Sequence, residues 1–176
     1  MKKILVFVST LDGKITQWGN SPVKKWTSRE DQDYFHKTWN EASIIVEGSS
    51  TFNVAPMKPN PEHYIVVMTR TPSKYKEHEV AGQLEFTDQS PAEIVEKYEK
   101  KGLHIMLVGG GAHVATSFLK ANLIDEVWLT FEPKIFGTGG NFVAEEKLDI
   151  DLQLISVEKV NEKGTLITKY KVKKVK

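Results

Sequence analysis

The chain has 176 residues, of which 40% are hydrophobic and 27% charged, and its formal net charge is +1. This length predicts one domain, spanning residues 1–176, with a sizeable buried core. The near-neutral charge gives no reason to expect a nucleic-acid or membrane partner, and no apolar run is long enough to span a membrane. Cysteine is absent. This excludes disulfides, thiolate zinc sites and a cysteine nucleophile, and fits a soluble cytoplasmic protein.

The first half of the chain alternates short apolar runs with helical patterns. Three continuous apolar runs are typical of strands buried on both faces: residues 4–8, 43–46 and 64–68. A helix is predicted to begin at Thr27 or Ser28 and to continue to Trp39, because an acidic residue follows each hydroxyl by three positions, as in a capping box. Gly48 ends the second run and leads towards another helix. A short strand over 84–86 follows the third run.

Asp31 lies in the first turn of the helix that follows Thr27, and two roles are open to it. It precedes Tyr34 and Phe35 by three and four residues, so its side chain leans towards the apolar face. A carboxylate there either interacts with the helix dipole or acts as a catalytic group at the edge of a pocket. The helix pattern alone favours the structural role.

The second half of the chain continues the alternation of strands and helices. Ser90 begins a helix with proline at the next position, and Gly102 follows its end. An apolar run over 105–108 predicts a strand, which three glycines and then a helical pattern follow. Residues 125–131 predict another strand, and a glycine-rich loop over 136–142 comes next.

From residue 152 the apolar period becomes two, and a turn over 161–164 leads into a second alternating run over 166–172. These features predict a β-hairpin. Residues 169–176 alternate lysine with apolar side chains, which fits an exposed strand edge guarded by lysines better than a nucleic-acid-binding patch. The whole pattern predicts a three-layer α/β/α domain with a mixed, mostly parallel sheet and an antiparallel C-terminal hairpin.

Small residues follow three of the predicted parallel strands, at 48–51, 69–71 and 109–111. Ligands gather beyond the carboxyl ends of such strands, so these segments would form one groove if the strands are neighbours. Its glycines would let a pyrophosphate approach the backbone, and Arg70 could meet an additional phosphate. By themselves, the three glycines over 109–111 fit a tight connection without a ligand equally well, and they only half match the G-x-G-x-x-G pattern.

The sequence gives no reason to expect a metal site. The five histidines show no ligand spacing, and there is no cysteine to add a thiolate. A serine nucleophile is equally unsupported, because the chain has no G-x-S-x-G elbow.

Short motifs along the chain together resemble a known family. The motifs are Ser9-x-x-Asp12-Gly13-Lys14-Ile15; Trp26-Thr27-Ser28; Gly48-x-x-Thr51-Phe52; Val67-Met68-Thr69-Arg70; Val108-Gly109-Gly110-Gly111; and Leu123-Ile124-Asp125-Glu126-Val127 through Pro133 to Gly137-x-Gly139-x-x-Phe142. In this order they are similar to the reductase domain of the bifunctional riboflavin-biosynthesis deaminase–reductase, the RibD C-terminal domain family of the dihydrofolate reductase-like superfamily. The resemblance covers nearly the whole chain.

This resemblance implies a dihydrofolate reductase-like fold, NADPH bound across the strand ends, and hydride transfer to a small heterocycle or its sugar phosphate. In the riboflavin enzyme that substrate is 5-amino-6-(5-phosphoribosylamino)uracil. The cofactor-binding residues that the resemblance implies are Gly48, Ser49, Thr51, Thr69, Arg70, Gly109, Gly110, Gly111 and Ala112. Asp12, Trp18 and Trp26 would border the substrate, and Asp31 resembles the carboxylate that binds the pteridine in dihydrofolate reductase. The family also implies a homodimer.

Two residues depart from the family pattern. Ser49 replaces an arginine, which makes NADH an alternative to NADPH and leaves Arg70 as the main candidate for the 2′-phosphate. Glu47 stands where an apolar residue is common. Among enzymes, dihydrofolate reduction is the alternative reaction, and a non-catalytic nucleotide-binding module is the alternative of another class. A partner zinc deaminase is excluded within this chain, because it has no cysteine.

Overall fold

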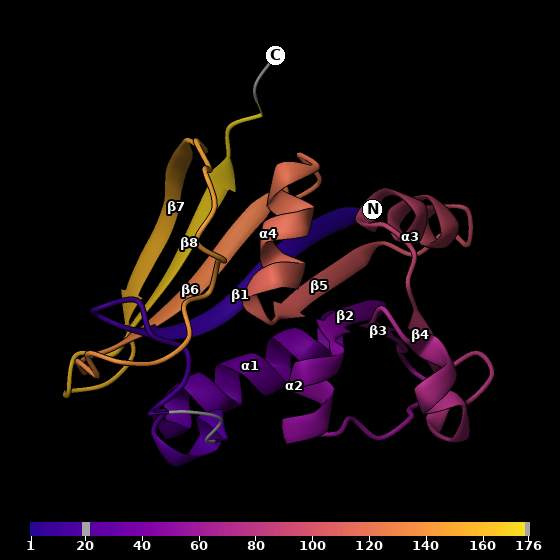
Figure 1. Ribbon diagram of the computed structural model, residues 1–176. Helices are drawn as coiled ribbons and strands as arrows, with labels where there is room; N and C mark the ends of the chain where they lie inside the picture. The colour runs from indigo at the N-terminus through magenta and orange to yellow at the C-terminus, as the bar shows by residue number, and fades with distance from the viewer. Residues whose placement is uncertain (19–21, 175–176) are drawn as a thin grey trace.

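The computed structural model describes residues 1–18 and 22–174 as one mixed sheet with helices on its faces (Figure 1). The strands are β1 (Lys2–Thr10), β2 (Ile44–Gly48), β3 (Tyr64–Met68), β4 (Leu84–Thr87), β5 (Ile105–Gly110), β6 (Glu126–Glu132), β7 (Leu152–Lys159) and β8 (Leu166–Val172). Their order is β4-β3-β2-β5-β1-β6-β8-β7. Pairs from β4 to β6 are parallel, whereas β8 is antiparallel to both β6 and β7. The predicted sheet with its C-terminal hairpin is confirmed.

Helices on both faces of the sheet complete three layers. The helices are α1 (Arg29–Glu41), α2 (Ser49–Val54), α3 (Pro91–Glu99) and α4 (Ala112–Lys120), with short 3₁₀ segments η1 (Val23–Lys25) and η2 (Pro72–His78). Apolar residues of α3 and α4 share one core cluster with β1, β2 and β5. Residues of α1 and α2 join clusters on the opposite face. Among the described residues, no helix is long and apolar enough to cross a membrane.

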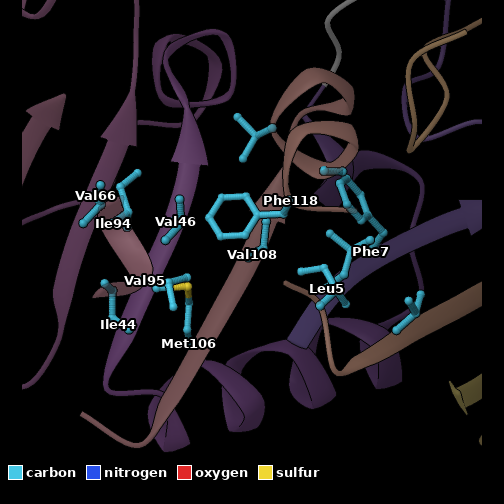
Figure 2. Packing of buried hydrophobic residues seen from close by; sticks show 14 of the residues in the cluster. Leu5, Phe7, Ile44, Val46, Val66, Ile94, Val95, Met106, Val108 and Phe118 are labelled. Atoms are coloured by element: carbon cyan, nitrogen blue, oxygen red, sulfur yellow. The ribbon is translucent and has the colours of Figure 1, made fainter. Parts of the chain in front are cut away.

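The core between the sheet and α4 contains Phe118, which is completely buried. Figure 2 shows its ring beside Val46 of β2 and Val108 of β5. Because strand side chains alternate, the neighbouring Ile45 and Leu107 point to the other face and join the cluster beneath α1. The central strands are therefore buried on both faces, which explains their continuous apolar runs.

The first turn of α1 uses one of the two predicted capping registers. Ser28 is the N-cap, and its Oγ accepts a hydrogen bond from the backbone N–H of Asp31 at 3.2 Å. Thr27 therefore precedes the helix. The predicted helix start at Ser90 is confirmed, and Ser90 forms a capping box with Glu93 at the start of α3.

The prediction that the lysine-rich end of the chain forms the sheet edge is wrong for the residues that the structure describes. β8 carries these lysines and lies between β6 and β7, so β7 forms the edge. The alternation instead separates the two faces of β8. Val172 is buried, whereas the Nζ atom of Lys169 lies over Trp128, 4.0 Å from the ring centroid. Val175 and Lys176 lie outside the described residues.

Replacement of Phe118 by alanine is expected to lower the free energy of unfolding by about 3–5 kcal/mol, because it leaves a cavity between α4 and the sheet. Phe118→Leu keeps most of the volume and should cost clearly less. Denaturant unfolding of both variants measures the difference. Equal losses would contradict the central position of this ring.

Candidate active site

The ends of β2 and β5 lie side by side, with β3 on the other side of β2, as the predicted groove requires. Glu47 of β2 is opposite Gly110 of β5. A Cβ atom on Gly48 would lie 3.1 Å from Cγ2 of Val114 and 3.7 Å from the backbone nitrogen of Gly111. The two glycine segments therefore approach each other closely. The three strands are neighbours, so the condition for one groove is met.

The turn between β5 and α4 requires glycine at its centre. Gly110 has a φ of +118°, and a Cβ atom there would lie 2.9 Å from Cε1 of Phe7. The peptide bond between Gly110 and Gly111 is cis. A Cβ atom on Gly109 would meet no atom within 4 Å beyond its chain neighbours, so the space above this residue is open. A ligand can therefore approach the backbone here.

Polar groups at the start of two helices face this turn. α4 begins at Ala112, and its N-cap Gly111 provides no side-chain hydrogen bond. The first backbone N–H groups of a helix have no partner within it and favour an anion. Oγ1 of Thr51, from the neighbouring α2, would lie 3.6 Å from a Cβ atom on Gly111. Ser49, at the start of α2, is half-buried. This combination suits a phosphate-bearing ligand.

Thr69 and Arg70 follow β3, on the far side of β2 from the glycine turn. The backbone N–H of Thr69 donates to the Thr87 carbonyl oxygen at 2.8 Å, and its hydroxyl accepts the N–H of Thr71 at 3.3 Å. Arg70 is exposed. The backbone of this segment is thus fixed, and the guanidinium extends from it at the surface.

Asp31 lies at the start of α1 with its side chain buried in the fold. Burial raises the pKa of its carboxyl to about 6. A hydrogen bond with Thr130 and one with Thr27 oppose this rise, and the charge of Glu132 reinforces it. The sequence left open whether Asp31 is a partner of the helix dipole or a catalytic group at the edge of a pocket. Asp31 is only 5% exposed and lies in the first turn of α1, so both roles stay predictions.

Glu132 is a second buried carboxylate beside Asp31, and the sequence did not identify it. Its oxygens accept the backbone N–H of Ser28 at 2.6 Å and the hydroxyl of Thr165 at 2.8 Å. It therefore joins the start of α1 to the ends of β6 and β8. A lone glutamate at the end of a strand gives no local signal of burial, because its partners come from distant segments of the chain.

The carboxylate of Asp12 is already occupied by hydrogen bonds. It accepts the hydroxyl of Thr10 at 2.5 Å and the backbone N–H groups of Phe136 and Gly137 at 3.2 and 2.7 Å. The bond from Thr10 contributes most to holding the pKa of Asp12 below its usual value. Asp12 therefore fastens the glycine-rich loop over 136–142 to the end of β1. Its contact with the substrate stays a prediction.

Both predicted aromatic residues contact Phe136 of that loop. The ring of Trp26 is buried and meets Phe136 edge-on, with centroids 5.2 Å apart. Trp18 is 72% exposed, and its Nε1 donates to the Phe136 carbonyl oxygen at 3.4 Å. Trp26 thus supports the loop from within the fold and Trp18 covers it from outside. Direct contact of either ring with the substrate stays a prediction.

Residues 2–166 match the RibD C-terminal domain family. The chain belongs to this family. It is 25% identical to the protein YyaP of Bacillus subtilis (strain 168) over 163 residues. These residues cover 87% of this chain and 86% of YyaP. The family membership that the motifs indicated is confirmed.

Solved structures support the fold of this RibD C-terminal domain. A pyrimidine reductase-like protein from Corynebacterium diphtheriae has a TM-score of 0.82 at 14% identity, over 99% of this chain and 92% of that one. A dihydrofolate reductase from Enterococcus faecalis has a TM-score of 0.69 at 20% identity, over 97% and 96% of the two chains. The predicted dihydrofolate reductase-like fold is confirmed.

The raised pKa of Asp31 makes its effect on stability dependent on pH. In the unfolded chain the carboxyl ionises near its ordinary value of 3.8, whereas in the fold it ionises at about 6. Between these pH values the folded state therefore binds more protons than the unfolded chain. The contribution of Asp31 to the free energy of unfolding falls as pH rises from about 4 to about 6 and is constant above that. Relative to that of the wild type, the free energy of unfolding of Asp31→Asn should therefore rise by up to about 3 kcal/mol across this pH range.

Asp33→Asn is the matched control for this measurement, because Asp33 lies on the same helix with a side chain that is 70% exposed. Denaturant unfolding of wild type and both variants at several pH values gives the comparison. A pH-independent difference between Asp31→Asn and wild type would contradict the buried, proton-binding carboxyl.

Proposed function

We propose that this protein is an NADPH-dependent oxidoreductase that transfers hydride to a small heterocycle or its ribose phosphate, as in the reduction of 5-amino-6-(5-phosphoribosylamino)uracil. One observation carries the proposal. A glycine turn that admits a ligand to the backbone and a buried acid with a pKa of about 6 lie in one RibD C-terminal domain. A dinucleotide and a proton donor are the two components that such a reduction needs.

The residues at the strand ends fit a dinucleotide. A Cβ atom on Gly110 would clash with Phe7 and one on Gly48 would crowd Val114, so at both positions bare backbone is available to a ligand. In the proposal, Gly48, Ser49 and Thr51 hold the pyrophosphate, Thr69 and Arg70 the adenosine 2′-phosphate, and Gly109, Gly110, Gly111 and Ala112 the remaining phosphate and the nicotinamide. The bound cofactor would supply the hydride. The similar dihydrofolate reductase from Enterococcus faecalis was crystallised with NADP(H), which supports this assignment.

Asp31 is the acid that we assign to proton delivery, directly or through a water molecule. With a pKa of about 6, the carboxyl is protonated in about a tenth of the molecules at pH 7. A group of this kind can both give up and regain a proton near neutral pH. Asp12, Trp18 and Trp26 border the substrate in this proposal, with the loop over 136–142 held between them. Most of the rate enhancement would come from positioning the two reactants.

A direct assay separates the proposed reaction from its nearest alternative. NADPH oxidation by the purified protein is measured with the pyrimidine ribotide and with dihydrofolate. The proposal expects turnover of the ribotide. Dihydrofolate reduction is favoured by the position of Asp31 on α1, and turnover of dihydrofolate alone would replace the first reaction with the second.

A non-catalytic nucleotide-binding module is the alternative of another class, favoured by serine in place of arginine at position 49. Calorimetry with NADPH, NADH and free nucleotides tests it. Binding of free nucleotides without binding of either reduced cofactor at millimolar concentration would exclude both reductase activities.

Arg70→Ala is expected to weaken NADPH binding by about 1.5–3 kcal/mol, the usual cost of losing a charged hydrogen bond, and to leave NADH binding nearly unchanged. Arg29→Ala is the matched control, because Arg29 is exposed on α1 and pairs with Asp33 at 3.6 Å. Fluorescence or calorimetric titration of each variant gives the dissociation constants. An equal loss for both cofactors would contradict the assignment of the 2′-phosphate to Arg70.

We also propose that the protein is a homodimer joined through β7. Every residue of this edge strand is exposed, and its aliphatic side chains include Leu154 at 52% and Val157 at 55%. An unprotected apolar edge strand readily pairs with another chain. Antiparallel pairing of two copies about Ile155 would set Asp151 of each copy opposite Lys159 of the other, so the edge is self-complementary in charge.

Leu154→Glu is expected to convert the dimer into a monomer, because it places a carboxylate in the apolar centre of this edge. Ile135→Glu is the control, since Ile135 is 75% exposed and lies outside β7. Size-exclusion chromatography with light scattering measures the mass of each. A wild-type monomer, or a dimer that Leu154→Glu leaves intact, would contradict the interface.

A further inference from the structure

Three acids are buried in the described part of the chain, and one of them differs from the others. Asp31 and Glu132 both have hydroxyl or N–H partners. Glu47 is only 5% exposed, and its Oε1 is buried without a hydrogen-bond partner. A buried polar group with no partner costs free energy, so a residue of this kind calls for a ligand or a function that uses it.

The side chain of Glu47 points to the face of the sheet that α1 covers. Its neighbour Val46 faces Phe118 of α4 (Figure 2), and a Cβ atom on Gly48 would approach Val114 of α4. Because side chains alternate along a strand, Glu47 must point the opposite way. Asp31 enters the fold from that same face, on α1.

Open space on this face lies over Gly109 of the neighbouring strand β5. The register between β2 and β5 pairs Val46 with Val108 and Glu47 with Gly110, so Gly109 is an additional residue in β5. Strand alternation sets Gly109 on the α1 face, and nothing beyond its chain neighbours lies within 4 Å of a Cβ atom there. A ligand over Gly109 would therefore lie beside Glu47.

We propose that Glu47 is a substrate-recognition residue whose carboxyl group hydrogen-bonds to a neutral hydroxyl or amide group of a substrate bound over Gly109. This inference rests on the proposed reductase function and adds a specificity-determining residue to it. Asp31 contacts Thr130 of β6, three strand spacings from β2, or roughly 14 Å. The two acids would therefore meet different parts of one elongated substrate, such as a ribosylated heterocycle.

The charge state of Glu47 defines the chemistry that it recognises. Burial alone raises the pKa of this carboxyl to about 8, so the neutral acid predominates at pH 7. A neutral carboxyl offers one O–H donor and one carbonyl acceptor, whereas a carboxylate offers acceptors only. A hydroxyl or amide group matches that pair. An ionised phosphate matches only half of it, because its oxygens only accept and would leave the carbonyl oxygen of Glu47 without a donor.

Two substitutions separate recognition from a purely structural role. Glu47→Gln keeps one donor and one acceptor at nearly the same positions, and Glu47→Met keeps the length but removes both. With the pyrimidine ribotide as probe, kcat/KM of Glu47→Met should fall by about tenfold to a hundredfold, mainly through KM. Glu47→Gln should stay within about threefold of wild type. NADPH dissociation constants, measured by titration, should stay within about threefold for both.

Thermal unfolding checks that both variants fold, and Glu47→Met should unfold at a temperature no lower than wild type, since it removes an unpartnered buried acid. Unchanged kcat/KM in Glu47→Met, with wild-type turnover intact, overturns the inference alone. A loss in Glu47→Gln as large as in Glu47→Met overturns the neutral-acid assignment. Wild-type protein that oxidises no NADPH with the ribotide or with dihydrofolate contradicts the proposed function, and the inference falls with it.

Discussion

The candidate site depends on two glycines against which the core packs closely. A Cβ atom on Gly110 would lie 2.9 Å from Phe7, and one on Gly48 would lie 3.1 Å from Val114. Phe7 and Val114 belong to the same core cluster, which packs α3 and α4 against the sheet. The packing that stabilises the fold therefore also brings two strand ends and the start of α4 together as bare backbone. Site and core cannot be altered independently here.

Burial of carboxyl groups is the second feature that sets the chemistry. Burial is the main cause of the raised pKa of both Asp31 and Glu47, and no cation among the residues that the structure describes counters it. Such groups destabilise a fold when they ionise, and they occur most often where function uses them. Asp31 has hydroxyl partners that hold it in place, which suits proton delivery. Glu47 lacks a partner for Oε1, which suits recognition of a group that arrives with the substrate.

Much of the fold could be predicted because the patterns that reveal it are local. Apolar runs gave the central strands, Ser90 and Ser28 gave helix starts, and glycines marked the strand ends that lie together. The prediction that the lysine-rich end forms the sheet edge was wrong, because an alternation of lysine with apolar residues indicates the two faces of a strand and not its position in the sheet. The exposed edge is β7, whose position follows from pairing with β8.

The site was less predictable, because its properties come from contacts between distant segments. Asp12 binds backbone groups more than 120 residues away, at Phe136 and Gly137, so its sequence neighbours do not reveal that role. The burial of Asp31 depends on β6, and that of Glu132 on Thr165 of the hairpin. Glu47 attracted notice only as a departure from a family pattern. Its position beside Gly109 required the register of β2 and β5.

A crystal structure of the protein with bound NADPH would show directly where the cofactor lies relative to the glycine turn and Asp31. The nicotinamide ring is expected at the Gly110 and Gly111 end of the glycine turn, with its reactive C4 facing the substrate space over Gly109 on the face of the sheet that α1 covers, and the 2′-phosphate is expected beside Arg70. Density for NADPH at another place, or a nicotinamide turned away from Asp31 towards solvent, would contradict this assignment.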